Sequence, residues 1–398
     1  MNTTPDKSVP ICGPYDPGGQ PPLPPQGEFQ IGLFAFNVSS GATMSTAVND
    51  DPDGSRDIWK WSNMSHHVQL AEKAGLDFAL PFGRWIGHGG KTAFNDTSMD
   101  VTTTCAALGA VTETIKLFGT THVTYGIHPM QVAKMGAGID QISQGRWGLN
   151  VVTGWYPEEM DMFSPEYHPD HDLKYEMADE FVTYLKAAWA AEEPFDFDGR
   201  FFKSKGAFLS PKPTASPRPP FVNAGQSPAG IDFATKNCEY LFMAADPHDL
   251  EKTTEQIKKV KDRAAHHGRE IRCLAPIYVI VRETREDAEG VAEHVRAHID
   301  IGAAEGFIGH SLSDPKQSMA DYGSGSMDKS LARKIALGLR APELIGSYQD
   351  IIDAMVGLKK AGLDGVAMSV FNYREDIGEF EKLMPALRDA LAAVNQVD

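Results

Sequence analysis

Short apolar segments alternate with longer amphipathic segments along most of the chain. The apolar segments are residues 29–36, 77–82, 115–123, 147–154, 219–225, 240–245, 273–281 and 365–371. Each is short and mostly apolar, as is typical of a β-strand that is buried on both faces. Eight such segments predict a sheet whose strands lie inside the molecule.

The segments between these strands carry apolar residues at helical spacing. They comprise residues 58–74, 130–142, 175–191, 249–266, 284–299 and 347–360. Strands that alternate with helices indicate a parallel sheet. Eight strands favour an α/β fold of the (β/α)₈ TIM-barrel type over an open sheet, although the count alone leaves both possible.

The chain is longer than a bare barrel needs. It has 398 residues, whereas a barrel of this type needs ~250. The surplus predicts insertions after strands 1, 4 and 7, at about residues 37–57, 155–218 and 302–346. Residues 1–28 contain eight prolines and are expected to be a disordered leader or an arm against a partner subunit. Residues 29–398 are then one domain.

Charge and cysteine content exclude several classes of function. The net charge of −17 argues against nucleic acid and against an anionic membrane, because both need a basic surface. The four cysteines are far apart in sequence, so neither a disulfide framework nor a zinc site is expected. No apolar run approaches the ~20 residues of a membrane span. We therefore expect a soluble, cytoplasmic protein without a metal.

Candidate site residues follow from the barrel rule that active sites form at the carboxyl ends of the strands. This rule selects residues 82–84, 120–122, 150–155 and 224–227. Asn150 stands out because a polar amide in an apolar strand must be hydrogen-bonded. It is either a residue bonded to a neighbouring strand or an amide directed at a ligand in the barrel mouth.

The segment AGQSPAG at 224–230 predicts the start of a helix. Ser227 is a favourable N-cap and Pro228 a favourable first helical residue. The free N–H groups of that turn would attract a phosphate. A capped helix without a bound phosphate is equally compatible with these residues. The chain carries no GxGxxG, GxSxG or HExxH motif, which argues against a bound dinucleotide, a serine hydrolase and a zinc protease.

Three longer runs carry a family resemblance. They are GRWGLNVVTGWYPEE at 145–159, DFALPFGRWIGHGGKTAF at 77–94 and FVNAGQSPAG at 221–230. Together they resemble the bacterial luciferase-like flavin monooxygenases. The resemblance covers about residues 29–390. It is strongest to the pyrimidine oxygenases of uracil breakdown and weaker to the alkanesulfonate and dimethyl-sulfone monooxygenases.

The resemblance implies roles for individual residues. It places flavin contacts at Gly83, Arg84, Asn150, Glu159, Lys174, Tyr175 and Ser227. Thr120 and Asn150 would be the catalytic pair that holds dioxygen, and Phe82, His122 and Trp155 would line the substrate pocket. Lys174 stands where the family has arginine, which keeps the positive charge but loses the bidentate fork.

The implied reaction uses reduced FMN (FMNH2) and O2. The enzyme would oxygenate or cleave a small organic heteroatom compound, such as a cyclic amide, a sulfone or a sulfonate. The oxygen would be carried as a peroxide at flavin nitrogen 5 or at carbon 4a. NAD(P)H would act through a separate flavin reductase, and the enzyme would be a homo-oligomer, either a dimer or a tetramer. The loops 37–57 and 302–346 would be candidate lids that exclude water.

Other functions on the same barrel are considered beside this one. A deazaflavin-dependent dehydrogenase would bind deazaflavin without consuming O2, and Thr120 and Asn150 count against it. A non-catalytic flavin-binding protein would hold oxidised flavin without turnover. An isomerase or aldolase would need a lysine or metal-binding carboxylates at the strand ends, where the sequence offers none clearly.

Overall fold

The computed structural model describes residues 16–311 and 335–394. Parallel pairing closes a ring of eight strands, because β8 pairs with β9 and β11 pairs with β1. This confirms the predicted barrel. The ring contains β1 (Gln30–Phe34), β2 (Phe78–Leu80), β3 (Lys116–His122), β4 (Trp147–Val152), β7 (Phe221–Asn223), β8 (Tyr240–Phe242), β9 (Arg272–Arg282) and β11 (Gly365–Val370).

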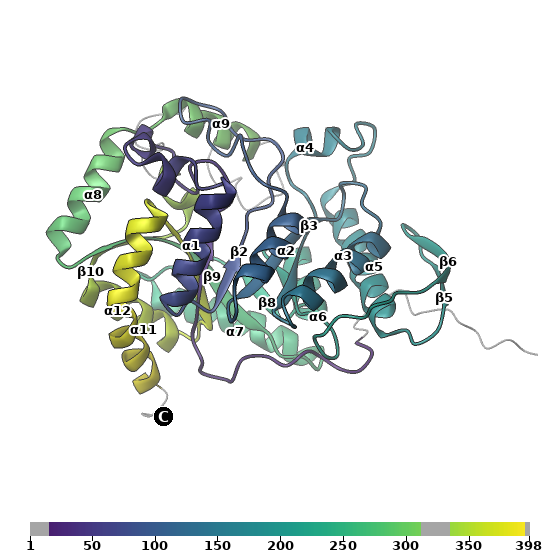
Figure 1. The fold of residues 1–398 in the computed structure, drawn as a ribbon. Helices are drawn as coiled ribbons and strands as arrows, with labels where there is room; N and C mark the ends of the chain where they lie inside the picture. Colours follow the sequence, from purple (N-terminus) through teal and green to yellow (C-terminus); the bar gives the residue numbers. More distant parts are fainter. Residues whose placement is uncertain (1–15, 312–334, 395–398) are drawn as a thin grey trace, which may run out of the picture.

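Helices surround the ring on its outer side (Figure 1). They include α1 (Trp61–Lys73), α2 (Val101–Val111), α3 (Pro129–Ile142), α5 (His171–Ala190), α6 (Pro228–Asn237), α7 (Leu250–His266), α8 (Arg285–Ala297), α11 (Tyr348–Lys360) and α12 (Tyr373–Ala393). The pattern of the sequence did not predict α2 or α12. The first is a short Thr- and Ala-rich helix with a weak apolar stripe, and the second contains Pro385.

The insertion expected as a long loop at 302–346 contains regular structure at both of its described ends. It begins within α9 (Ile301–Ser311) and finishes with β10 (Glu343–Ser347). The 11-residue strand β9 extends beyond the ring, and its last five residues pair with β10. A loop over the whole insertion was therefore a wrong expectation. The middle of the insertion lies outside the described residues.

The other two insertions also differ from simple loops. Residues 37–57 form two short turns of helix, η1 (Thr46–Asn49) and η2 (Pro52–Arg56), and most of the segment is buried. Residues 155–218 contain α4 (Pro157–Asp161), α5 and an antiparallel hairpin of β5 (Phe195–Asp198) and β6 (Lys203–Ala207). This insertion therefore carries regular structure, and its hairpin turns between Asp198 and Lys203.

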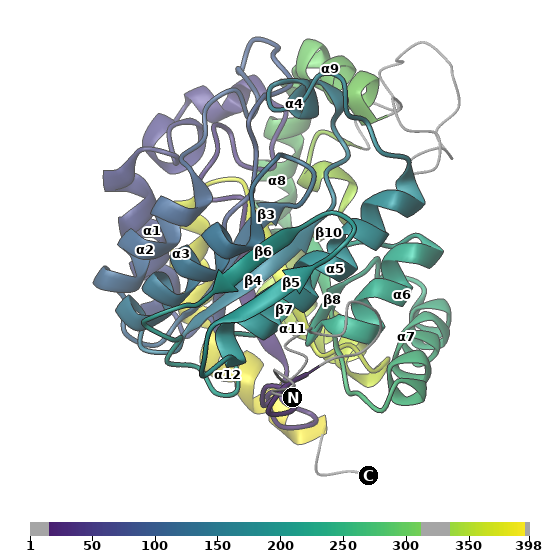
Figure 2. The same cartoon turned by 90° about the vertical axis from the view of Figure 1, so that its right-hand side faces the viewer.

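The two ends of the barrel are covered by different segments. Helices α4 and α9 lie together at one end, and the purple segment that precedes β1 runs past the opposite end (Figures 1 and 2). Helix α4 follows β4 in the chain, and parallel strands have their carboxyl termini at the same end. The end that carries α4 and α9 is therefore the carboxyl end of the barrel. No helix in the described part of the chain is long and apolar enough to cross a membrane.

Candidate active site

A cavity of about 400 Å³ opens at the carboxyl ends of the strands. Every residue to which the resemblance gave a role lines it except Glu159. Those that line it are Phe82, Gly83, Arg84, Thr120, His122, Asn150, Trp155, Lys174, Tyr175 and Ser227. They come from strands and helices that span nearly 150 positions of the sequence, and the closure of the barrel brings them together.

Thr120 and Asn150 form the polar pair inside this cavity. They are register partners on β3 and β4, and the Asn150 Nδ2 donates to Thr120 Oγ1 at 3.1 Å. The Thr120 hydroxyl donates to the carbonyl of Pro81 at 3.3 Å. Asn150 is 6% exposed, and its Oδ1 accepts no hydrogen bond from the described residues. The structure therefore confirms the bond between neighbouring strands, and the contact of this amide with a ligand stays a prediction.

A second polar region surrounds the start of α6. Ser227 caps this helix by accepting a hydrogen bond from the Gly230 N–H at 3.1 Å, and Pro228 is its first residue, as predicted. A Cβ at Gly225 would lie 2.1 Å from the Tyr175 hydroxyl, and one at Gly230 would lie 2.7 Å from it. The two glycines thus admit the phenol beside a helix N-terminus, where free N–H groups favour an anion.

Lys174 adds a positive charge to the same side of the cavity. Its side chain is buried, and Nζ donates to the Gly154 carbonyl at 3.2 Å. Gly154 has a φ of +82°, and a Cβ there would lie 2.6 Å from Thr124 Oγ1. The strained turn after β4 therefore needs glycine to bring its carbonyl to this lysine.

Arg84 and Glu159 form a buried ion pair next to the cavity. Glu159 is 1% exposed and accepts hydrogen bonds from Arg84 Nη1 at 3.3 Å, the Trp85 N–H at 2.7 Å and the Tyr125 hydroxyl at 2.6 Å. Burial acts to raise the pKa of Glu159, but Arg84 and these donors outweigh it and hold the pKa below its usual range. This carboxylate is not a lining group, so it acts on the 84–86 backbone and on the arginine.

The guanidinium of Arg84 is positioned by aromatic rings as well. Its Cζ lies 4.6 Å from the centre of the Phe82 ring and 5.0 Å from that of Trp155. Its Nε is buried and has no hydrogen-bond partner within the described ranges. Cation–π contact and the Glu159 pair thus hold a charged donor at the cavity wall.

His122 contributes a neutral ring to the cavity. It stacks on Tyr125, with ring centres 4.4 Å apart and an interplanar angle of 6°. Burial lowers its pKa to about 4, with a further contribution from Arg84 and with Glu159 opposing. At neutral pH the ring is therefore an uncharged donor or acceptor.

Several lining residues were not selected from the sequence. Asn223 links β7 to β4 through the Val151 carbonyl at 2.7 Å and receives the Gly225 N–H at 2.8 Å, so it shapes the turn before Ser227. His171 begins α5 and also lines the cavity. Asn223, like Asn150, is a polar amide in an otherwise apolar strand segment, and the same argument could have identified it. His171 had no such signal, because it lies in a polar segment.

The rest of the wall is mainly apolar. It is formed by Phe34, Leu80, Phe242, Pro276, Phe307, Leu339, Ala341 and Ala367. Phe307 belongs to α9 and packs edge-on against His88 at 5.2 Å between ring centres. The segment 87–92 is bonded to the region before α9, because Asp300 accepts from the Thr92 N–H at 2.7 Å.

The sequence was also compared with known proteins. The family model described as "Luciferase-like monooxygenase" matches residues 29–365. This chain belongs to that family. The luciferase-like proteins are flavin-dependent monooxygenases, so the match confirms the predicted family and enzyme class. Residues 1–28 precede the matched region.

Two curated relatives illustrate the range of the luciferase-like family around this chain. The pyrimidine monooxygenase RutA of Acinetobacter baylyi is 31% identical over 342 residues, which cover 83% of this chain and 89% of that protein. An FMNH2-dependent dimethylsulfone monooxygenase of Pseudomonas putida is 28% identical, with 89% and 95% covered. The sequence motifs described above resemble those of both subfamilies.

Solved structures share the luciferase-like barrel. A riboflavin lyase, RcaE, whose crystal structure holds a modified FMN and riboflavin, has a TM-score of 0.79 and 23% identity, with 91% of this chain and 92% of that chain covered. The long-chain alkane monooxygenase LadA also has a TM-score of 0.79, with 21% identity and 91% of each chain covered. At this identity the likeness concerns the fold.

Proposed function

We propose that this luciferase-like protein is a two-component, FMN-dependent monooxygenase. It would use reduced FMN and O2 to oxygenate or cleave a small organic heteroatom compound such as a cyclic amide, a sulfone or a sulfonate. One observation carries the proposal. The same cavity is lined by Ser227, at a helix N-terminus suited to phosphate, and by Asn150, whose Oδ1 has no partner among the described residues.

The residues of this cavity fit a flavin mononucleotide. Tyr175, Lys174 and the N-terminus of α6 at Ser227 would hold the phosphate, because they combine a phenol, a cation and free N–H groups. The Oδ1 of Asn150 would accept from an N–H group of the ring, and Arg84 would offer its unused Nε. A bound, reduced flavin supplies the two electrons that activate dioxygen.

The chain's own residues position and shield the reaction. Thr120 and Asn150 would orient the reacting groups at the centre of the cavity, while Phe82, Trp155 and His122 would face the substrate. Phe307 and Leu339 add apolar surface from the 302–346 insertion, which excludes water from the site. A separate NAD(P)H:flavin reductase and a dimeric or tetrameric assembly are parts of the same proposal.

The test starts with oxygen-free protein and reduced FMN, to which aerated buffer is added in a stopped-flow instrument. We expect an oxygenated flavin spectrum that persists longer than that of free FMN. Uracil, dimethyl sulfone and an alkanesulfonate are then screened with ¹⁸O2, and incorporation of one labelled atom into a product supports the proposal. Asn63→Ala removes a hydrogen-bonded amide near the start of α1, outside the cavity lining, and serves as the matched control for cavity variants.

Two other functions give different results in the same experiment. Tight binding of a deazaflavin without consumption of O2 would indicate the dehydrogenase. Tight binding of oxidised FMN, with no oxygenated flavin and no labelled product, would indicate a flavin-binding protein without catalysis. Either result would contradict the monooxygenase.

A further inference from the structure

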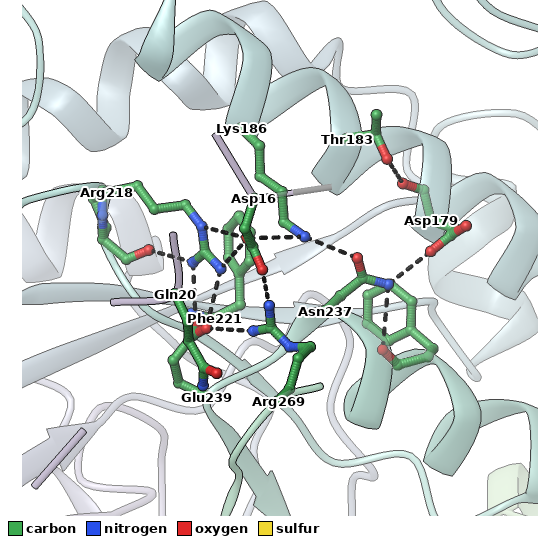
Figure 3. Close-up of polar contacts among 12 residues, drawn as sticks. Asp16, Gln20, Asp179, Thr183, Lys186, Arg218, Phe221, Asn237, Glu239 and Arg269 are labelled. Carbon is green, nitrogen blue, oxygen red and sulfur yellow. Dashed lines mark hydrogen bonds and ion pairs between the residues drawn. The ribbon is translucent and has the colours of Figure 1, made fainter. Parts of the chain in front are cut away.

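A cluster of buried charged side chains lies at the amino ends of the strands, away from the cavity. Arg218 precedes β7, Glu239 precedes β8 and Arg269 precedes β9, while Lys186 reaches in from α5. The fifth member, Asp16, belongs to the segment before β1. Figure 3 shows the five side chains converging, with Asp16 between the three cationic groups.

The carboxylate of Asp16 is shared by all three cations. Its Oδ1 accepts from Arg218 Nη2 at 2.8 Å and lies 3.2 Å from Lys186 Nζ. Its Oδ2 contacts Arg269 Nη1. One acidic side chain from a proline-rich segment therefore supplies the common counter-charge of three basic residues.

Glu239 provides the other negative charge of the cluster. It pairs with Arg218 Nη1 at 3.0 Å and with Arg269 Nη2 at 2.7 Å, and it also accepts from the Phe221 N–H at 2.7 Å. Without Asp16, Glu239 remains the partner of Arg218 and Arg269, and Lys186 keeps its bond to Asn237, which donates in turn to Asp179. Within the five-residue cluster, three basic groups would then stand against one carboxylate. The excess of up to 3 − 1 = 2 positive charges matches the charge of a phosphate dianion in magnitude.

Burial makes that excess costly. The Lys186 side chain is 0% exposed, and those of Arg218 and Arg269 are nearly as buried, whereas Asp16 is 13% exposed. Buried cations that lose their partner are strongly destabilising. In the described residues, Arg269 Nε is buried without a hydrogen-bond partner, so the cluster has a donor that Asp16 does not use.

We propose that Lys186, Arg218 and Arg269 form an oxyanion-binding site, which Asp16 fills from within the chain and which inorganic phosphate occupies when that carboxylate is withdrawn. Two guanidinium forks and an ammonium group suit the oxygens of a tetrahedral anion. The site is separate from the FMN cavity, because it lies at the opposite end of the barrel. It does not depend on the proposed reaction.

The segment that carries Asp16 is attached to the barrel by local contacts. The Gln20 amide donates to the Glu270 carbonyl at 2.7 Å and accepts from the Glu270 N–H at 3.2 Å, and both bonds are exposed. The Pro24 carbonyl accepts from Arg272 Nη2 at 2.9 Å. Asp16 can therefore leave the cluster without any change in the pairing of the strands.

The test measures thermal unfolding of the full-length chain in increasing phosphate, against chloride at equal ionic strength. For Asp16→Asn we expect a saturable rise of the Tm with phosphate, because the anion replaces the lost carboxylate. Asp198→Asn, which removes an exposed carboxylate paired with Lys203, is the matched control. The wild type and this control should show only the small, non-saturating rise that phosphate gives to proteins in general.

The double variant Asp16→Asn/Arg269→Gln decides whether the site is the cause. We expect it to lose the saturable rise. Equal Tm shifts in Asp16→Asn, the control and the double variant would overturn the proposal and leave a purely structural ion cluster.

A second measurement applies if Asp16→Asn does not fold. Gln20→Ala keeps the cluster and removes the bonds to Glu270. In this variant, phosphate should compete with Asp16 and increase hydrogen–deuterium exchange in the 16–28 segment by at least a few-fold. Unchanged exchange at saturating phosphate would contradict the proposal.

Discussion

The two ends of the barrel use buried polar side chains in opposite ways. At the carboxyl ends, Asn150 and Arg84 line a cavity of about 400 Å³, and Asn150 Oδ1 and Arg84 Nε are buried without a partner among the described residues. At the amino ends, Arg218 and Glu239 meet in a buried pair, and Asp16 adds a second carboxylate. The first end holds the cavity in which we propose that a ligand binds, and the second holds part of the protein's own chain.

This contrast predicts that substitutions at the two ends separate activity from stability. A side chain that faces the cavity contributes to ligand binding and to the reaction, and little of the fold depends on it. A side chain in the ion cluster helps to hold β7, β8, β9 and α5 together, and none of the five cluster residues is among those that line the cavity. Each prediction below tests one side of that separation.

The largest effect is expected for Glu239→Gln at the amino ends. The change leaves Arg218 and Arg269 without their fully buried partner, and breaking such a pair costs about 3–5 kcal/mol of unfolding free energy. Urea unfolding measures the loss. Product formation per folded molecule should stay unchanged. Glu270→Gln, which alters an exposed ion pair with Arg272, should change the unfolding free energy by less than about 1 kcal/mol.

Asn150→Ala should have the opposite signature. It removes the amide from the centre of the cavity, and we expect product formation to fall by roughly 10²–10³-fold, the magnitude seen when one preorganised donor or acceptor is lost. The Tm should fall only slightly, because a single hydrogen bond to Thr120 is lost. Normal activity in this variant, or a Tm as low as that of Glu239→Gln, would remove the distinction between the two ends.

The pattern of the sequence predicted the barrel and much of its mouth. Eight short apolar runs became the eight strands of the ring, because strands covered by helices on one side and by the barrel interior on the other are apolar throughout. Ser227 was found from capping chemistry alone. The strand-end rule selected residues 82–84, 120–122 and 150–155, and the family resemblance alone supplied Lys174 and Tyr175.

The failures have a common physical cause. The buried position of His67 on α1 was not identified from the sequence; its ring stacks on Tyr373, whose ring centre is 6.1 Å away. Asp16 was hidden in a proline-rich segment, because its partner Arg218 is 202 positions away. The partners of the Glu159 carboxylate, the N–H groups of Trp85 and Ile86, are also distant in sequence, and its contact with the flavin stays a prediction. Contacts between distant segments leave no local pattern from which such partners can be read.

Gly225→Ala should weaken flavin binding by at least about tenfold, which corresponds to ~1.4 kcal/mol. The new Cβ would lie 2.1 Å from the Tyr175 hydroxyl, so the phenol must move away from the start of α6. Fluorescence titration with FMN measures the change. Gly138→Ala, a change on α3 where a Cβ meets nothing within 4 Å, should bind FMN normally.

The double variant Gly225→Ala/Tyr175→Phe sharpens this test. Removing the hydroxyl relieves the clash, so its affinity should resemble that of Tyr175→Phe alone. If the double variant binds FMN as weakly as the sum of both changes predicts, the glycine does not act through Tyr175, and the phosphate cradle is arranged differently from our proposal.

The last prediction concerns a difference in pH dependence between the two ends. Burial lowers the pKa of His122 at the mouth to about 4 and, with Arg218 adding to it, lowers the pKa of Lys186 at the amino ends to about 7. Each group therefore binds its proton more readily in the unfolded chain, and stability rises with pH across each window. For His122 the window is about pH 4 to 6.5, and for Lys186 it is about pH 7 to 10.5.

Tm measurements from pH 4 to 10.5 assign each window to one end. His122→Gln should flatten part of the acidic slope and leave the alkaline slope intact. Lys186→Met should do the reverse. His67→Phe is the reference for the acidic side, because burial also lowers the pKa of His67 to about 4, far from the cavity. An unchanged alkaline slope in Lys186→Met would contradict a lowered pKa of Lys186. The other groups of the amino-end cluster would then offset the cost of burying its charge.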